Sequence, residues 1–227
     1  MQVEFVRGAF RCHFRLEAVL AAKAPANSAF GFQQDMRGIK KMIKLNTTEL
    51  KDKAKTLRAG DKVLLSGTVY TSRDAAHKRI RELCERGGEL PYALEGAAIY
   101  YAGPTAAKEG MVIGSCGPTT SGRMDVYSPD MLDMGLSAMI GKGERSEAVC
   151  EAIRRNGAVY FCAIGGAGAL ACKCITECEV IAFEDLGCES VKRLTFNEFP
   201  LIVAIDCVGG NIFLEGRRPF DHSREIV

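Results

Sequence analysis

The chain has 227 residues, of which 47% are hydrophobic and 26% charged, the balance of an ordinary globular protein. Residues 1–40 carry six basic and three acidic side chains, which leaves 24 basic and 25 acidic side chains in the remainder. A basic nucleic-acid-binding surface is therefore not expected. No apolar run approaches the roughly 20 residues that a membrane-spanning helix needs, so no membrane span is expected either.

Residues 1–40 differ in character from the rest of the chain. They contain scattered Arg and Phe residues and an Ala-rich centre. We expect an N-terminal extension that is disordered or a non-native start, with a targeting peptide as the weaker alternative, because Ser is scarce and acidic residues interrupt the pattern. Residues 41–227 are expected to form one domain.

The predicted elements begin with a helix start at 47–50, followed by a strand at 62–70. A helix is predicted at 73–86, because Ala76, Ile80, Leu83 and Cys84 share one face, and Ser72 stands where an N-cap belongs.

Later elements follow the same alternation. The pair Gly209-Gly210 predicts a hairpin between two late strands. The mixture predicts α/β or α+β layers around one core. Further strands are predicted at 97–101, 110–115, 136–140, 157–163, 178–183 and 201–207, and further helices at 127–135 and 145–156.

Residues 117–125, GPTTSGRMD, are the most informative segment. A Gly-Pro turn leads from a strand into a polar run, which predicts a helix N-terminus, where unpaired N–H groups attract anions. Thr119 and Thr120 add hydroxyls, and the planar Arg123 suits a carboxylate. The alternative is a pair of helix-capping threonines beside a solvated arginine.

The segment around Arg73 follows a strand in the same way. Arg at a helix N-terminus opposes the helix dipole, which suggests another role. The alternative is a surface ion pair between Arg73 and Asp74. His77 either lines a site or is a structural histidine whose hydrogen bonds are satisfied.

Lys142 lies between Gly141 and Gly143 after a predicted strand, where the backbone can approach a ligand closely. An ordinary turn would look the same. The Gly-rich run 165–169 lacks a nucleotide-binding pattern. The acidic pair Glu184-Asp185 either caps an element or faces the cations above.

The chain contains ten cysteines, most of them inside apolar runs. Free cysteine behaves there as a small buried hydrophobe, and with no secretory signal a reducing cytoplasm is expected. Cys172, Cys174 and Cys178 do not have the paired spacing of zinc ligands, so no metal site is expected.

Taken together, six segments resemble the C-terminal domain of class I fumarate hydratases, which is a separate beta subunit in two-subunit members. The resemblance runs in order over about residues 45–215. The beta subunit of L-tartrate dehydratase is similar, but its threonine motif tends to have Met in place of Gly122 and Glu in place of Asp125. The segments are 62–79 (KVLLSGTVYTSRDAAHKR), 117–125, 141–143 (GKG), 163–169 (AIGGAGA), 184–187 and 199–211 (FPLIVAIDCVGGN).

The resemblance implies an α/β fold: a swivelling β/β/α domain with mixed sheet layers and flanking helices. Such a domain closes over an iron–sulfur alpha subunit whose cysteines hold a 4Fe-4S cluster. This chain is then expected to bind no cofactor alone, and to join a hetero-oligomer with a homodimeric core.

The resemblance also implies the site residues. Thr119 corresponds to the proposed catalytic base, while Arg73, Arg123 and Lys142, with Thr120, would hold the substrate carboxylates. His77 and Asp74 are expected to contact these residues and hold them in position, rather than to bind the substrate themselves. The implied activity is the reversible hydration of fumarate to (S)-malate, a tricarboxylic acid cycle reaction. The alternatives are a tartrate dehydratase beta subunit and a non-catalytic module that binds an anion or a partner.

Overall fold

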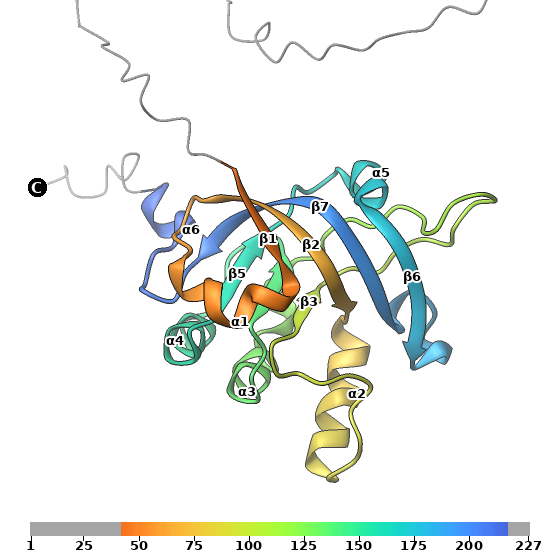
Figure 1. Ribbon diagram of the computed structural model, residues 1–227. Helices are drawn as coiled ribbons and strands as arrows, with labels where there is room; N and C mark the ends of the chain where they lie inside the picture. Colours follow the sequence, from red (N-terminus) through yellow and green to blue (C-terminus); the bar gives the residue numbers. More distant parts are fainter. Residues whose placement is uncertain (1–41, 218–227) are drawn as a thin grey trace, which may run out of the picture. The chain divides into compact units, whose positions relative to one another are not determined.

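The computed structural model describes residues 42–217 (Figure 1). Five strands run parallel in spatial order from β1 to β5, and each is hydrogen-bonded to the next. They are β1 (Ile43–Asn46), β2 (Lys62–Thr71), β3 (Ala98–Tyr100), β4 (Ala138–Gly141) and β5 (Val159–Cys162).

The long strand β7 (Val191–Ile205) closes this sheet into a ring. It pairs antiparallel with β5 at one side and with β2 at the other, so β2, β3, β4, β5 and β7 form a closed circuit. Strand β6 (Ile175–Ala182) pairs antiparallel with β7 and flanks the ring, as β1 does beside β2. A bulge interrupts the β2–β7 pairing at Gly67, whose φ of +108° favours glycine.

Alternate residues of the strands build two separate cores, because successive side chains point to opposite faces. The inner core fills the ring. Tyr100 on β3 lies 5.8 Å from the Phe196 ring and 5.6 Å from the Phe199 ring, measured between centroids. Since β3 and β7 are not neighbours in the sheet, these contacts cross the ring interior.

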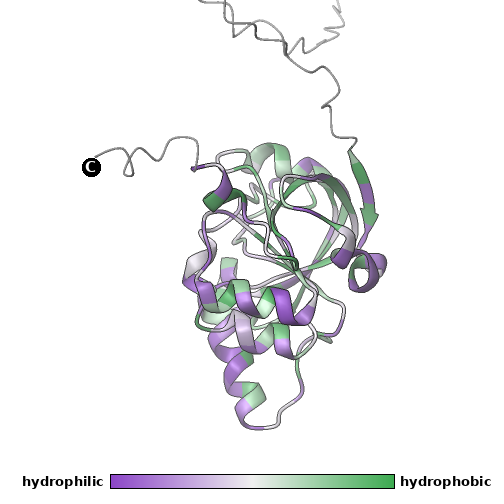
Figure 2. Ribbon diagram, turned by 90° about the vertical axis from the view of Figure 1, so that its left-hand side faces the viewer, coloured by the Kyte–Doolittle hydropathy of each residue, from purple (hydrophilic) through white to green (hydrophobic). Residues whose placement is uncertain are grey.

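The outer core lies between the ring and three helices, α2 (Asp74–Glu85), α3 (Ser128–Asp133) and α4 (Glu147–Asn156). Figure 1 shows these helices together on one side of the strands. Ile99 and Met139 from the strands are fully buried there, with Ile153 from α4. In Figure 2 the helices carry both hydrophilic and hydrophobic residues, as amphipathic helices do.

Short helical segments connect these elements. At Thr47, the predicted helix start is confirmed by a capping box, in which Asn46 Oδ1 accepts from Thr48 N and Glu49 Oε2 accepts from Asn46 N. The segments are η1 (Thr47–Glu49), α1 (Leu50–Lys53), η2 (Ala54–Thr56), η3 (Ser121–Met124), α5 (Gly168–Ala171), η4 (Cys172–Cys174), η5 (Glu184–Glu189) and α6 (Ile212–Glu215).

The predicted α/β class is confirmed, and three local predictions are wrong. Residues 110–115 form turns and bends rather than a strand. The predicted hairpin is a tight turn that leads into α6, with one isolated bridge between Ile205 and Asn211. Arg73, not Ser72, is the N-cap residue of α2. The extension predicted for residues 1–40 lies outside the described residues.

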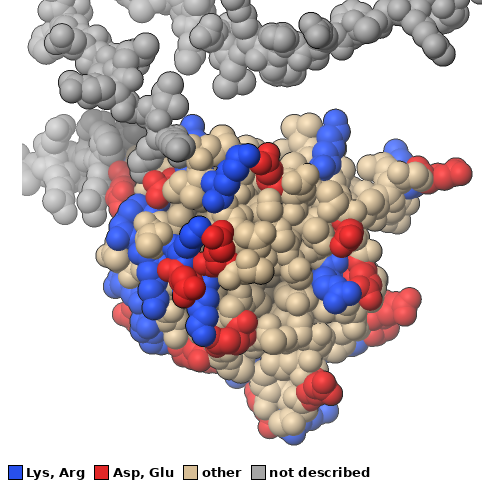
Figure 3. All heavy atoms as spheres, in the orientation of Figure 1, with Lys and Arg blue, Asp and Glu red and all other residues tan. Residues whose placement is uncertain are grey.

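The surface mixes charges of both signs. On the face seen in Figure 3, Lys and Arg side chains are interspersed with Asp and Glu, and a broad central area carries no charged side chains. Among residues 42–217, no helix combines the length and apolar character needed to cross a bilayer.

Candidate functional site

The parallel strands end together at one edge of the ring. Thr71, the last residue of β2, pairs with Tyr100 at the end of β3, and Tyr100 pairs with Ile140 near the end of β4. The loops that follow these strands therefore start side by side. Arg73 follows β2 and Lys142 follows β4, at the carboxyl edge where α/β sheets usually bind ligands.

Thr119 enters the same edge between two of these loops. Its N–H donates to the carbonyl of Tyr101 at 2.6 Å, and its own carbonyl accepts from Lys142 N at 3.2 Å. Thr120 forms an isolated parallel bridge with Lys142. Thr119 is partly buried, while Thr120 and Lys142 are exposed. The fold therefore places the predicted threonines directly beside the predicted lysine.

The helix N-terminus predicted in the segment 117–125 is present only as the start of a short turn. The segment forms only η3, one turn of 3-10 helix, and α3 starts later at Ser128. Thr120 stands at the N-cap position of η3, but its side chain makes no capping hydrogen bond. A turn this short offers no helix N-terminus for an anion. Any affinity for anions here must come from the side chains and from individual N–H groups.

Arg123 reaches toward the start of α2. Its Nη2 lies 2.9 Å from Asp74 Oδ2, whereas Arg73 Nη2 lies 3.9 Å from the same oxygen. Asp74 is therefore a shared partner of the two arginines. The alternative considered from the sequence, a simple surface ion pair between Arg73 and Asp74, does not describe this arrangement. The Arg123 side chain remains 52% exposed, so its other N–H groups are open to a ligand.

Arg73 is held more tightly, with its side chain only 19% exposed. Its Nη2 lies 3.3 Å from Glu189 Oε1, and the other Glu189 oxygen accepts from Ala75 N at 3.1 Å. A Cβ added at Gly103 would lie 2.5 Å from Arg73 Nη1, so the guanidinium packs against glycine backbone. Arg73 Nε is buried and has no hydrogen-bond partner within residues 42–217.

His77 lies fully buried beneath Arg73. Its Nδ1 is 3.0 Å from the Arg73 carbonyl and 2.7 Å from Ser72 Oγ, an arrangement in which Nδ1 carries the proton and donates to the carbonyl. Burial lowers the pKa of His77 from 6.5 to about 4, so the ring is neutral at neutral pH. The contact supports the backbone of Arg73, but Nε2 is buried without a hydrogen-bond partner among residues 42–217, so His77 is not the fully satisfied structural histidine of the alternative.

Sequence reasoning missed a buried cation, Arg145. Its Nε donates to Asp125 Oδ1 at 2.7 Å and its Nη2 to Ser128 Oγ at 2.6 Å. The guanidinium carbon lies 5.4 Å from the ring centroid of Tyr101 and 5.0 Å from that of Tyr160. Asp125 Oδ2 also accepts from Ser146 N at 2.6 Å. These contacts join η3 to the loop that carries Lys142.

Of two further sequence features, one lies away from the candidate site and the other lies at its edge. Asp185 bonds to Arg79, at 2.7 Å between Oδ1 and Nη1, and not to the cations of the candidate site. The Gly-rich loop after β5 does lie at the site edge, because a Cβ added at Gly165 would be 3.6 Å from Lys142 Cδ. In the described part of the chain, no group of three or more His, Cys, Asp or Glu side chains is arranged to hold a metal ion.

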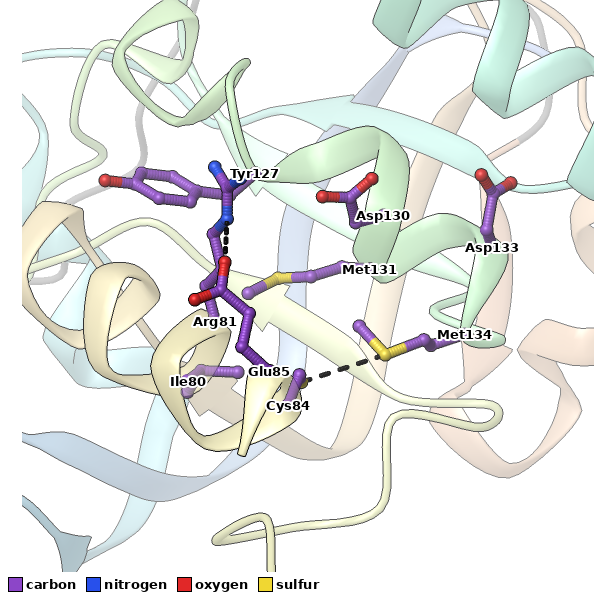
Figure 4. Close-up of a pocket in the computed structure, with 9 residues that line it drawn as sticks. All are labelled: Ile80, Arg81, Cys84, Glu85, Tyr127, Asp130, Met131, Asp133 and Met134. Carbon is purple, nitrogen blue, oxygen red and sulfur yellow. Dashed lines mark hydrogen bonds and ion pairs between the residues drawn. The ribbon is translucent and has the colours of Figure 1, made fainter. Parts of the chain in front are cut away.

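A groove of about 400 Å³ lies between α2 and α3, away from this edge (Figure 4). Its lining includes Ile80, Cys84, Met131 and Met134, and Cys84 Sγ lies 3.8 Å from Met134 Sδ. These α2 residues belong to the second half of the helix, whereas Arg73 precedes its first residue. The groove is therefore separate from the candidate site.

The fold and this edge together define an α/β domain whose loops bring cationic and hydroxyl side chains to one place, a candidate site for a small anion. The chain matches the family described as "Fumarase C-terminus" over residues 17–216. It therefore belongs to this family of class I hydro-lyase domains, as the sequence resemblance indicated.

Relatives of two kinds are found. Fumarate hydratase class I, anaerobic, from Escherichia coli is 40% identical over 66% of this chain, and fumarate hydratase 2 from Leishmania major is 38% identical over 68% of it. Each alignment spans 28% of the relative's own length, so this chain matches little more than a quarter of those enzymes. L(+)-tartrate dehydratase subunit beta from E. coli is 34% identical over 82% of this chain and 94% of its own length.

Proposed function

We propose that this chain is the beta subunit of a class I fumarate hydratase. With an alpha subunit that holds a 4Fe-4S cluster, it catalyses the reversible hydration of fumarate to (S)-malate. The main support is that the fold brings three separate segments, which carry Arg73, Thr119 with Arg123, and Lys142, to one edge of a domain of this family.

The substrate class follows from the charges of the site. Fumarate is a small dianion, and two arginines and a lysine supply positive groups for its two carboxylates. Arg73 is the most firmly held of the three, because its side chain is only 19% exposed and its Nη2 lies 3.3 Å from Glu189 Oε1. Thr120 adds an exposed hydroxyl beside Lys142.

The reaction needs a proton to be lost or gained beside a carboxylate. The charge that develops on that carboxylate in the transition state is stabilised by fixed cations, which need little reorganisation. In this proposal Thr119 Oγ transfers the proton. A threonine hydroxyl is a weak base in water, so it depends on the positive charge of Lys142 and the arginines to favour its deprotonated form.

The iron–sulfur cluster is assigned to the alpha subunit. The cysteines at 42–217 form no ligand set, so the part of this chain in the reaction rests on its Arg, Lys and Thr side chains. The cluster supplies Lewis-acid chemistry to the substrate when the two subunits meet. A swivelling motion of this domain over that partner, a homodimeric core in the assembly and a cytoplasmic location complete the proposal.

L-Tartrate dehydration is the second candidate. It is favoured by the alignment with tartrate dehydratase beta subunits over 94% of their length, both in E. coli and, as a putative subunit, in Methanocaldococcus jannaschii. Both of these relatives are named as beta subunits. Against tartrate stand Gly122 and Asp125, which have the fumarase-like form of the threonine motif.

The test is co-expression with the alpha subunit from the same genome, followed by anaerobic assays on fumarate, malate and L-tartrate. We expect kcat/KM for fumarate and malate to exceed that for tartrate by tenfold or more. A higher value for tartrate would establish the second candidate. Binding of dicarboxylates without turnover of any of them would establish the non-catalytic anion-binding module.

A further inference from the structure

Lys142 lies between two glycines, the residues with the greatest backbone freedom, yet its peptide groups are all held. Its N–H lies 3.1 Å from Ser121 Oγ, and its carbonyl accepts from Ser121 N at 2.8 Å. The next carbonyl, that of Gly143, accepts from the Tyr160 hydroxyl at 2.9 Å. Ser121 and Tyr160 thus hold the segment from both sides.

The Tyr160 and Ser121 hydroxyls also contact each other, at 2.9 Å. A hydroxyl has one proton to donate and lone pairs that accept. All these contacts are satisfied when Lys142 N–H is shared between the Thr119 carbonyl and Ser121 Oγ, Ser121 donates to Tyr160, and Tyr160 donates to the Gly143 carbonyl. A Cβ added at Gly141 would lie 2.0 Å from Ser121 Oγ, so glycine at that position leaves room for the serine hydroxyl.

Tyr160 is itself rigidly placed. Its side chain is buried on β5, and the Arg145 guanidinium carbon lies 5.0 Å from its ring centroid. Burial raises the pKa of Tyr160, which keeps the hydroxyl neutral and able to donate. A residue buried this deeply reaches a ligand only through its neighbours.

We propose that Tyr160 is a positioning residue of the candidate site, which acts through Ser121 and the Gly143 carbonyl to hold Lys142 where it meets a substrate carboxylate. The role of Lys142 in this statement rests on the proposed function. Without the Tyr160 hydroxyl, the Gly-Lys-Gly segment regains freedom, and the lysine spreads over several positions. Misplacement by about 1 Å is enough to cost up to 100-fold in rate.

The test compares Tyr160→Phe with Tyr92→Phe. Tyr92 is an equally suitable hydroxyl deletion, since its ring is buried and stacked on Tyr70, and its hydroxyl has no partner within 42–217. The first measurement is amide hydrogen exchange of the peptide that contains residues 141–144, in the two-subunit protein. We expect exchange there to be about fivefold to tenfold faster in Tyr160→Phe, as for the loss of one hydrogen bond, and unchanged in Tyr92→Phe.

The second measurement is steady-state kinetics of the same proteins on the dicarboxylate that the wild type turns over. Tyr160→Phe should lower kcat/KM by about 10-fold to 100-fold, with a raised KM, while Tyr92→Phe keeps the wild-type value. Unchanged exchange at 141–144 would overturn the proposal, as would faster exchange with unchanged kcat/KM. If the wild-type protein turns over no dicarboxylate, the proposed function fails, and the exchange measurement still decides whether Tyr160 holds Lys142.

Discussion

Asp74 gives the arginines of the candidate site a defined arrangement before any ligand arrives. Its Oδ2 lies 2.9 Å from Arg123 Nη2 and 3.9 Å from Arg73 Nη2, so one carboxylate forms ion pairs with two guanidinium groups, neither of them with hydrogen-bond geometry. The fork of an arginine has five N–H donors, and a single oxygen contact leaves most of them for a ligand. The predicted role of Asp74 as a support for the substrate-binding residues agrees with this geometry and stays a prediction.

Arg123→Lys tests the geometry of the proposed carboxylate contact. Lysine keeps the charge and loses the planar fork, so substrate affinity should fall by roughly 1.5–3 kcal/mol, the worth of a charged hydrogen bond. The measurement is KM and inhibitor binding in the two-subunit enzyme. Arg81→Lys, a change of an exposed arginine on α2, is the control. Equal values for both variants would remove Arg123 from the site.

Thr119→Val tests the proposed proton transfer. Valine keeps the shape of the side chain and removes the hydroxyl, and a group that acts in the transition state affects kcat more than affinity. We expect kcat to fall by about 100-fold or more, with KM changed little and the melting temperature close to wild type. A lower melting temperature with wild-type kcat would mean that Thr119 serves the fold alone.

His77 predicts a dependence of stability on pH. Its pKa is about 4 in the folded protein and 6.5 in the unfolded chain, so between these values the unfolded state binds the additional proton. The contribution of neutral His77 to the free energy of unfolding is fully present above pH 6.5 and is lost as the pH falls toward 4. The total loss in unfolding free energy is roughly 3 kcal/mol.

Denaturant unfolding at a series of pH values checks this prediction. In His77→Phe the slope of unfolding free energy against pH should flatten between pH 6.5 and 4, whatever the absolute stability of the variant. The same slope in both proteins would show that His77 does not titrate as its burial implies.

At the scale of elements, the contact between Arg145 and Asp125 joins η3, α3 and the loop after β4. The Arg145 side chain is fully buried, and that of Asp125 is 13% exposed. Removing one member of a buried pair leaves an uncompensated charge, so Arg145→Met should lower the free energy of unfolding by about 3–5 kcal/mol. The exposed change Arg154→Met, whose ion pair with Glu147 spans 3.5 Å, should cost less than about 1 kcal/mol.

Chemical denaturation of Arg145→Met, of Asp125→Asn and of the double variant Arg145→Met/Asp125→Asn measures the coupling between the two side chains. We expect the double variant to be more stable than Arg145→Met, because the second change neutralises the carboxylate that the first leaves buried. Additive losses would show that the two side chains contribute independently.

The elements that the sequence predicted well are those with strong local periodicity. Helix α2 was predicted at 73–86 and spans Asp74–Glu85, and β2 was predicted at 62–70 and spans Lys62–Thr71. Strand β7 was found only in its last part, because a polar break at Glu198, a bulge residue with a φ of +49°, hides its continuity. The run 110–115 gave the opposite error, a predicted strand where none forms. Met111 and Val112 are exposed there, and neither lies in a strand pairing of the described residues.

The candidate site was predictable only in part, for a related reason. Arg73, Thr119 and Lys142 stand out because Gly, Thr or a charged residue follows a strand, which is a local signal. Tyr160 looked like an ordinary apolar strand residue, and Arg145 like one more surface charge. Their roles depend on contacts across more than ten residues of sequence, which no local pattern contains.

At the scale of the whole molecule, closure of the ring explains why loops far apart in sequence form one site. Strand β7 ties β2 to β5, so the carboxyl ends of β2, β3, β4 and β5 stay at one edge. Tyr100, Phe196 and Phe199 fill the interior and fix the distance across it. The cationic loops are therefore mounted on a rigid core, which preorganisation of charge requires.

The proposed division of labour between two subunits leads to the final prediction. Cluster ligands must be thiolates that can meet around one site. In this chain burial raises the pKa of Cys116 to about 12, and the cysteines of 42–217 form no group of three suited to a metal.

Anaerobic treatment of the isolated chain with iron and sulfide should therefore leave it without visible iron–sulfur absorbance and without hydratase activity. Addition of the reconstituted alpha subunit should supply both the visible absorbance and the hydratase activity, and the activity should depend on the concentration of this chain. A stable cluster on the isolated chain, or full activity of the alpha subunit alone, would contradict the arrangement, since the first places ligands here and the second makes Arg73, Thr119 and Lys142 dispensable.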